Sequence, residues 1–218
     1  RYINRSEEDI REIETLAAAL KSYATWFTTE TLQECREACG GKGYLAENRF
    51  ADLRADTDIF TTFEGDNTVL MQLVAKGLLT EYKQSFHDEG MMAILRMLGS
   101  RVYVSVAEMN PLAIRNTSSE HLLDSEFHLN AFSFREKQLL YSVAQRLRGK
   151  IKNGMRSYNA FLECQTHLIV LAEAFAERVV LEQFLKKLEN CEDQNLEGML
   201  KKLCDLFSLS TIEKHKGW

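Results

Sequence analysis

The sequence is short of proline and of long apolar runs. Pro111 is the single proline among 218 residues, and 45% of the residues are hydrophobic. Because proline interrupts helices, its scarcity in a chain with enough apolar residues for a sizeable core favours helical structure. No apolar run approaches the ~20 residues that a bilayer requires, so we expect no membrane span. No alternating strand pattern of convincing length occurs either.

The sequence also lacks an excess of positive charge. Its formal net charge is −5 and its pI is near 5.6. The longest basic runs are the pairs Lys186-Lys187 and Lys201-Lys202. Such a chain has no general attraction to a phosphate backbone, so we exclude nucleic acid as a partner.

Paired cysteines are missing as well. The five cysteines are an odd number, and none has the paired spacing of a secreted disulfide scaffold, which favours a reducing compartment. Cys35 and Cys39 stand four residues apart on one helix, but no His or Cys follows at metal-ligand spacing. We predict buried core thiols at both positions and no metal site. We interpret His121, His128 and His167 as surface or packed residues.

Helical periodicity is what the chain does contain. From residue 6 to 39 apolar or small residues recur at steps of three and four and form one helix face. They are Ile10, Ile13, Ala17, Leu20, Ala24, Phe27, Thr31, Cys35 and Ala38. Further helices are predicted from about 67 to 82, 91 to 109, 133 to 152, 155 to 189 and 195 to 213.

These elements predict an all-α fold, a helical bundle with a second helical layer that begins near Asp124. Asn110-Pro111 ends the helix at 91–109, because the residue before proline is pushed out of helical geometry. Polar residues 116–119 then mark a linker. We place a division there, into residues 1–115 and 116–218.

Residues 38–72 contain the one long segment that we expect to be non-helical, between the first helix and the helix that begins near residue 67. Gly40-Gly41 ends the first helix and a charged loop follows. Residues 41–46 fit the dinucleotide fingerprint G-x-G-x-x-A, but that motif needs a strand before it and a helix after it, so we reject a Rossmann site. One of Asp66, Asn67 and Thr68 caps the next helix.

Glu64 stands just ahead of that helix, in the sequence Glu64-Gly65-Asp66-Asn67. A carboxylate at such a place can complement the helix dipole, an effect of ~0.3–1 kcal/mol, or it can act as a base. The residues alone leave these two interpretations about even.

Two motifs of this segment resemble the carboxy-terminal part of the acyl-CoA oxidases, flavoproteins related to the acyl-CoA dehydrogenases. The motifs are residues 35–48, C-R-E-A-C-G-G-K-G-Y-L-A-E-N, and residues 61–70, T-T-F-E-G-D-N-T-V-L. A weaker similarity continues to residues 209–213, so it covers essentially the whole chain. The family's first two domains are absent, and we expect a truncated fragment that is inactive alone.

The resemblance implies the function of the whole enzyme. A fatty acyl-CoA would be converted to trans-2-enoyl-CoA, with FAD as the cofactor and with oxygen reduced to hydrogen peroxide. Glu64 matches the base that takes the α-proton, and a positioned base typically contributes 10²–10⁴-fold. Gly40, Gly41, Asp66 and Asn67 match positions near the dinucleotide half of FAD, often on the neighbouring subunit. Glu37 replaces a usual glutamine and is left out of this set.

The resemblance also implies a homodimer, and a location in peroxisomes if the source is eukaryotic or in the cytoplasm if it is bacterial. Two alternatives stay open at this point. One is a dehydrogenase of the very-long-chain type, which has a similar carboxy-terminal extension. The other is a helical dimerisation module without catalysis.

Overall fold

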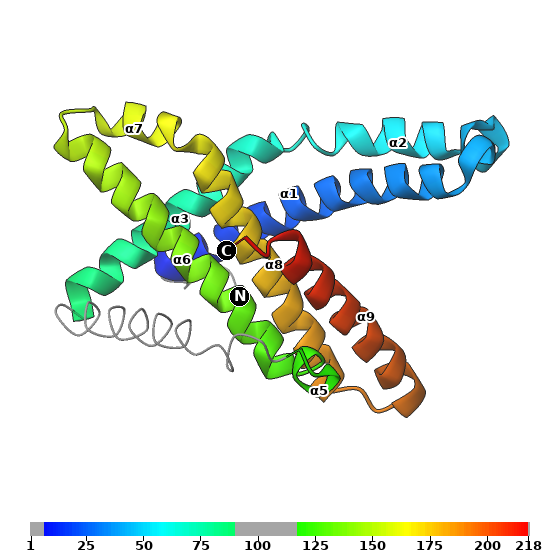
Figure 1. The fold of residues 1–218 in the computed structure, drawn as a ribbon. Coiled ribbons are helices and arrows are strands. Elements are labelled where there is room, and N and C mark those ends of the chain that lie inside the picture. The colour runs from blue at the N-terminus through cyan, green and yellow to red at the C-terminus, as the bar shows by residue number, and fades with distance from the viewer. Residues whose placement is uncertain (1–6, 90–116, 218) are drawn as a thin grey trace. The chain divides into compact units, whose positions relative to one another are not determined.

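The computed structural model describes residues 7–89 and 117–217, and the described residues contain helices, turns and no strand (Figure 1). The all-α prediction is therefore confirmed. The predicted helix at 91–109 and the division between residues 115 and 116 lie at or within the range that is not described. They stay predictions.

The first part of the chain contains three α-helices, α1 (Glu7–Ala38), α2 (Phe50–Ile59) and α3 (Asn67–Glu89). Two short 3₁₀ helices, η1 (Gly40–Tyr44) and η2 (Ala46–Asn48), make the turn between α1 and α2. The end of α1 before Gly40 and the start of α3 near residue 67 agree with the sequence prediction.

Helix α2 corrects the prediction of a charged loop between the glycines and Glu64. It has no buried residue, and its sequence F-A-D-L-R-A-D-T-D-I carries no apolar face that periodicity could reveal. It lies alongside α1, and Arg54 donates a hydrogen bond to Gln33 of that helix (Figure 1). Tertiary contact with α1 therefore supports a helix that its own pattern does not indicate.

The second part contains α5 (Ser119–Leu122), α6 (Ser125–Lys152), α7 (Ser157–Glu163), α8 (Gln165–Glu189) and α9 (Gln194–Lys214). Helix α6 begins eight residues before the predicted start at 133, and Asp124 accepts a hydrogen bond from the Glu126 N–H at its first turn, 2.9 Å. The single helix predicted at 155–189 is broken at Cys164. Asp193 caps α9, accepting from the N–H groups of Asn195 and Leu196 at 2.9 and 3.3 Å.

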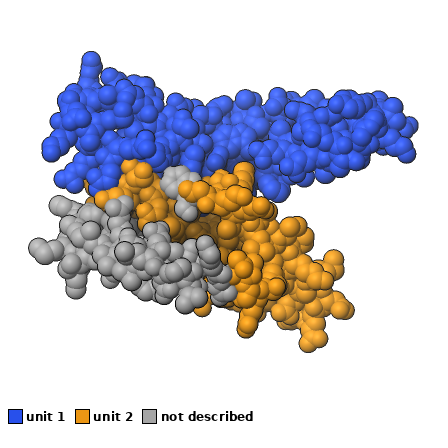
Figure 2. All heavy atoms as spheres, in the orientation of Figure 1, with its two compact units in different colours: residues 1–77, 143–176 blue, residues 78–142, 177–218 orange. Residues whose placement is uncertain are grey.

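The chain forms two compact units that are interleaved along the sequence (Figure 2). The first unit comprises Arg1–Gly77 with Val143–Ala176, and the second comprises Leu78–Ser142 with Glu177–Trp218. In the second unit Phe132, Leu181 and Cys204 are buried against Phe184, Leu185, Leu188, Phe207 and Ile212. The ion pairs Arg135–Glu177 and Arg178–Glu136 join α6 to α8 there.

The face of α1 that packs within the first unit is made of small residues. Thr15, Ala18, Ala19 and Ser22 are buried, at the helical spacing i, i+3, i+4, i+7. By contrast, the larger residues of the row predicted from periodicity are exposed, namely Ile10, Ile13, Leu20 and Phe27. Cys35 lies near the end of the same helix and Cys39 directly after it, and both are exposed thiols. The prediction that they are buried is wrong, because periodicity identifies an apolar face but not whether a neighbour covers it.

Small side chains on α1 allow α3 to approach closely. A Cβ atom added to Gly77 of α3 would stand 2.6 Å from Oγ1 of Thr15, well inside van der Waals contact. Both residues are buried, so there is little space for either to move. The contact between α1 and α3 thus depends on a glycine in the middle of a helix.

We predict that Gly77→Ala destabilises the protein by about 1–3 kcal/mol, because overpacking exceeds the gain in helix propensity. The matched control is Gly198→Ala in α9, where an added Cβ has no atom within 4 Å. That change should stabilise the protein by up to about 1 kcal/mol. Urea unfolding measures both values, and equal effects at the two sites would contradict the close packing of α1 on α3.

Candidate functional site

Glu64 lies at the turn between α2 and α3 in a strained backbone conformation. Its φ is +56°, in the left-handed region that costs a non-glycine residue about 1–2 kcal/mol. The side chain is exposed. In the part of the chain that the structure describes, neither its carboxylate nor its backbone N–H has a hydrogen-bond or ion-pair partner. Both groups of this exposed residue are therefore uncommitted within the described part of the chain.

Gly65 continues the turn with φ of +112°, a value that L-residues rarely adopt. A Cβ atom at this position would also approach the Leu70 side chain at 3.1 Å. On the other side of the turn, the rings of Phe60 and Phe63 pack edge to face with centroids 4.9 Å apart. The conformation around Glu64 is therefore fixed by residues on both sides of it.

Asp66 is the residue that caps α3. Its Oδ1 accepts hydrogen bonds from the N–H groups of Thr68 at 2.9 Å and Val69 at 3.3 Å. This resolves the choice among the three candidates from the sequence. The geometry is that of an ordinary N-cap, in which a carboxylate satisfies N–H groups of the first helical turn.

Asn67 is buried and joins α3 to α1. Its Oδ1 accepts from Nζ of Lys21 at 2.8 Å, and its Nδ2 donates to Oγ1 of Thr25 at 2.8 Å and to the Ser22 carbonyl at 3.3 Å. Its own N–H donates to the Thr61 carbonyl at 3.0 Å. Each of these polar groups of Asn67 therefore forms a hydrogen bond within the chain.

Lys21 completes this network at the base of the turn. Its ammonium group also donates to the Gly65 carbonyl, at 2.7 Å. The Lys21 ammonium therefore attaches both Gly65, the residue after Glu64, and Asn67, the first residue of α3, to α1. The sequence prediction missed Lys21. No local signal distinguishes it, because charged and polar residues occur along the whole of α1.

The Gly-Gly turn forms a second, separate cluster at the far end of α1. Gly40 and Gly41 are exposed, and a Cβ atom on either would have no neighbour within 4 Å. The turn is anchored by the Arg36 guanidinium, 4.5 Å above the Tyr44 ring, and by Asn48, whose Nδ2 donates to the Lys42 carbonyl at 2.7 Å. The residues Gly40 and Gly41 are therefore accessible to a ligand.

The structure does not bring all the predicted site residues together. Lys21 of α1 binds Gly65 and Asn67, which are close in the chain to Glu64 and Asp66, whereas Gly40 and Gly41 follow the end of α1 at residue 38. Seventeen helical residues separate the two places, which is roughly 25 Å. Their roles in binding or catalysis stay predictions.

Comparison with known families identifies both parts of the chain. Residues 2–79 match the family described as "Acyl-CoA oxidase, C-alpha1 domain", and residues 124–218 match "Acyl-CoA oxidase". The chain belongs to the acyl-CoA oxidase family. It corresponds to the carboxy-terminal helical part, as the two sequence motifs predicted.

The chain is also similar in sequence and in fold to individual acyl-CoA oxidases. The chain is 42% identical over 211 residues to acyl-coenzyme A oxidase 2, peroxisomal, of Arabidopsis thaliana, with 97% of this chain and 30% of the relative covered. It is 33% identical to human peroxisomal acyl-coenzyme A oxidase 3, with the same coverage. The crystal structure of acyl-CoA oxidase 1 from Yarrowia lipolytica superposes with a TM-score of 0.78 at 26% identity, covering 96% of this chain and 29% of that one. The chain thus spans about a third of these relatives.

We predict that Asn67→Ala lowers the free energy of unfolding by about 2–4 kcal/mol, because three side-chain hydrogen bonds are lost and Lys21 keeps one partner, the Gly65 carbonyl, among the described residues. The matched control is Gln194→Ala, which also replaces the first helical residue after an aspartate cap but is exposed. Its effect should stay within about 0.5 kcal/mol. Equal unfolding midpoints for the two variants would show that the network does not hold α3 on α1.

Proposed function

We propose that this chain is the carboxy-terminal helical part of an FAD-dependent acyl-CoA oxidase. The full-length enzyme would convert a fatty acyl-CoA and oxygen to trans-2-enoyl-CoA and hydrogen peroxide. The observation that carries the proposal is Glu64, an exposed carboxylate without an internal partner among the described residues, held in a strained turn within the part that matches the family. Strain of this kind is typical of functional residues.

Glu64 suits the role of general base. A carboxylate without an internal partner is available to accept the α-proton of a thioester. The N–H of the same residue is also uncommitted within the described part of the chain, so it can donate a hydrogen bond to the thioester carbonyl. That bond would make the α-proton more acidic. The left-handed turn lets one residue present both groups.

The network beneath Glu64 supports this role indirectly. Lys21 binds the Gly65 carbonyl and Asn67, so the turn is fixed before any substrate arrives. A prepositioned base loses little freedom on binding, which favours the reaction geometry. We propose that Lys21 and Asn67 are positioning residues.

FAD, when bound, supplies the acceptor for the hydride that leaves the β-carbon. The exposed turn at Gly40 and Gly41 suits a pyrophosphate, because neither glycine has a side chain that would keep a phosphate away from the backbone. Asp66 and Asn67 use their side chains to cap and anchor α3, so we propose that any contribution of theirs to the cofactor is indirect. Two Caenorhabditis elegans acyl-CoA oxidases that share this fold, with TM-scores of 0.76 and 0.77, have structures with FAD bound.

We further propose a homodimer in which the two clusters serve different active sites. The distance between Glu64 and the Gly-Gly turn supports this arrangement, since each cluster can then meet a different cofactor. The exposed apolar residues of α1 offer a surface for association.

Relatives are named peroxisomal, which supports that compartment for a eukaryotic source. Among the described residues no helix has the length and apolar character that crossing a membrane requires.

The central test is Glu64→Gln in the full-length enzyme. The amide keeps the size and the backbone N–H of the residue but cannot accept the α-proton, so turnover should fall by about 10²–10⁴-fold while acyl-CoA and FAD still bind. Anaerobic stopped-flow reduction of the flavin measures the step directly. Glu34→Gln, an exposed carboxylate on α1, is the matched control and should react at the wild-type rate. Flavin reduction at the wild-type rate in the Glu64→Gln enzyme would assign the base to another residue.

Association is tested on the 218-residue chain by light scattering. We expect a dimer at micromolar concentration and a shift toward monomer in Phe27→Glu, since that ring is 53% exposed in the apolar row of α1. Tyr158→Glu, at a ring that is 71% exposed on α7, should leave the dimer intact. A monodisperse wild-type monomer would rule out association through this chain alone.

A further inference from the structure

Positive charge is concentrated around the turn that joins α6 to α7 (Figure 1). Residues 146–163, here called the basic hairpin, lie within the first compact unit and have a formal net charge of +4. Since the whole chain carries −5, the other residues together carry −9. The cations of the hairpin are Arg146, Arg148, Lys150, Lys152 and Arg156, and its carboxylate is Glu163. They stand two to four residues apart, so no contiguous basic run reveals them.

Most of this charge is not neutralised within the described chain. Lys150 forms an ion pair with Glu163, and the hydrogen bond to that carboxylate raises the pKa of Lys150. The other four cations have exposed side chains. They make no hydrogen bond or ion pair in the part of the chain that the structure describes. Their charges therefore face solvent without an internal counterion.

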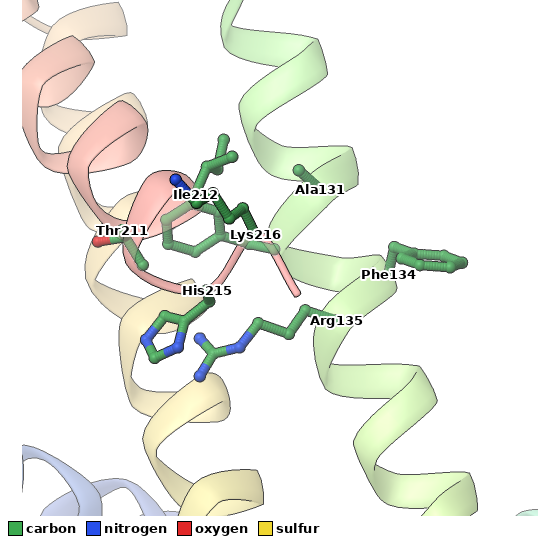
Figure 3. Close-up of a pocket in the computed structure, with 8 residues that line it drawn as sticks. Ala131, Phe134, Arg135, Thr211, Ile212, His215 and Lys216 are labelled. Atoms are coloured by element: carbon green, nitrogen blue, oxygen red, sulfur yellow. The ribbon is translucent and has the colours of Figure 1, made fainter. Parts of the chain in front are cut away.

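A buried arginine of the second unit shows the opposite arrangement. Arg135 lies beside His215 and donates a hydrogen bond to the carboxylate of Glu177 (Figure 3). A cation that supports the fold is thus paired with a carboxylate inside it, as burial requires. The unpaired cations of the basic hairpin have no such internal role.

The helix dipole does not account for the hairpin by itself. Lysines are expected in the last turn of a helix, where they complement its partial negative charge, and α8 ends with Lys186 and Lys187 for this reason. Around that end, however, residues 182–197 contain five carboxylates and have a formal net charge of −3. What distinguishes the end of α6 is the scarcity of carboxylates.

Exposed apolar side chains accompany the cations. Ile151 of α6 is 45% exposed, and Tyr158 and Leu162, one turn apart on α7, are 71% and 44% exposed. The two helices are joined through Gly154, whose φ of +89° suits glycine and permits a tight turn. A surface that combines unpaired cations with exposed apolar and aromatic side chains is typical of sites that bind at a membrane interface.

We propose that the basic hairpin binds the surface of an anionic membrane. The cations would contact anionic lipid head groups, and Ile151, Tyr158 and Leu162 would enter the interfacial region, which favours aromatic and apolar side chains. A soluble acidic partner would account for the cations alone, whereas a bilayer surface accounts for both kinds of side chain. Because the rest of the chain is negative, the same field would orient the hairpin toward the membrane. None of these residues belongs to the candidate site for acyl-CoA oxidation.

The test is cosedimentation of the 218-residue chain with lipid vesicles at low salt. One set contains phosphatidylcholine with about one third phosphatidylserine, and the other contains phosphatidylcholine alone. We expect binding to the anionic vesicles to be at least roughly tenfold tighter, and to weaken as salt is raised to about 0.5 M, because salt screens the charges.

Two double variants assign the binding to the hairpin. Arg148→Glu with Lys152→Glu should weaken binding to the anionic vesicles by roughly tenfold or more. The matched control is Lys186→Glu with Lys187→Glu, which changes the net charge equally at the end of α8 and should bind like the wild type.

The apolar contribution is tested separately. Ile151→Ser with Tyr158→Ser should weaken binding by roughly threefold or more, because less apolar surface enters the interface. The control is Met199→Ser with Leu206→Ser, two side chains of α9 that are each 66% exposed and lie outside the hairpin. It should bind like the wild type.

Circular dichroism establishes that each variant is folded, and Arg148→Gln with Lys152→Gln replaces the charge reversal if that variant does not fold. Wild-type affinity in the hairpin charge variant, or an equal loss in the α8 control, would overturn the proposal. Displacement of the chain from vesicles by soluble polyglutamate, together with wild-type vesicle binding in Ile151→Ser with Tyr158→Ser, would replace the membrane by an acidic protein partner.

Discussion

The lysine ammonium between α1 and the turn before α3 is the interaction on which the candidate active site depends. Lys21 binds the Gly65 carbonyl and the Asn67 side chain, at 2.7 and 2.8 Å. Glu64 directly precedes these residues and sits in the left-handed region, a conformation that persists only where its surroundings impose it. Hydrogen bonds to a charged group are about twice as strong as neutral ones, so the ammonium is well suited to hold this turn.

Helix α1 has one face that is buried and another that is exposed. The small face of α1 is buried and admits α3 at Gly77, whereas the row of larger apolar residues is exposed. Close helix contact requires small side chains, because bulky ones keep the two backbones apart. The larger residues retain an apolar surface that association can bury. One helix therefore combines a buried face of small residues with an exposed row of larger apolar residues.

The candidate site residues followed from the sequence only in part. The resemblance of two motifs to the acyl-CoA oxidases is what pointed to Glu64 and the Gly-Gly turn, and the roles of these residues stay predictions. Lys21 was not found, because a lysine on a long helix resembles any solvated residue until its partner 44 positions away is known. Helix α2 was missed for a related reason. Its charged sequence has no apolar face, and its neighbour α1 is what supports it.

The fold class, most helix ends and the family of this protein follow from its sequence alone. They depend on local chemistry: apolar spacing, aspartate caps, glycine turns and two short motifs. The folded chain was needed to establish which face of α1 is buried, which residue caps α3 and which groups Lys21 holds. The exposure of Cys35 and Cys39 likewise emerged from the folded chain. Most of these features depend on contacts between residues that are distant in the chain. A periodic pattern identifies the apolar face of a helix, but it does not show which other element packs against that face.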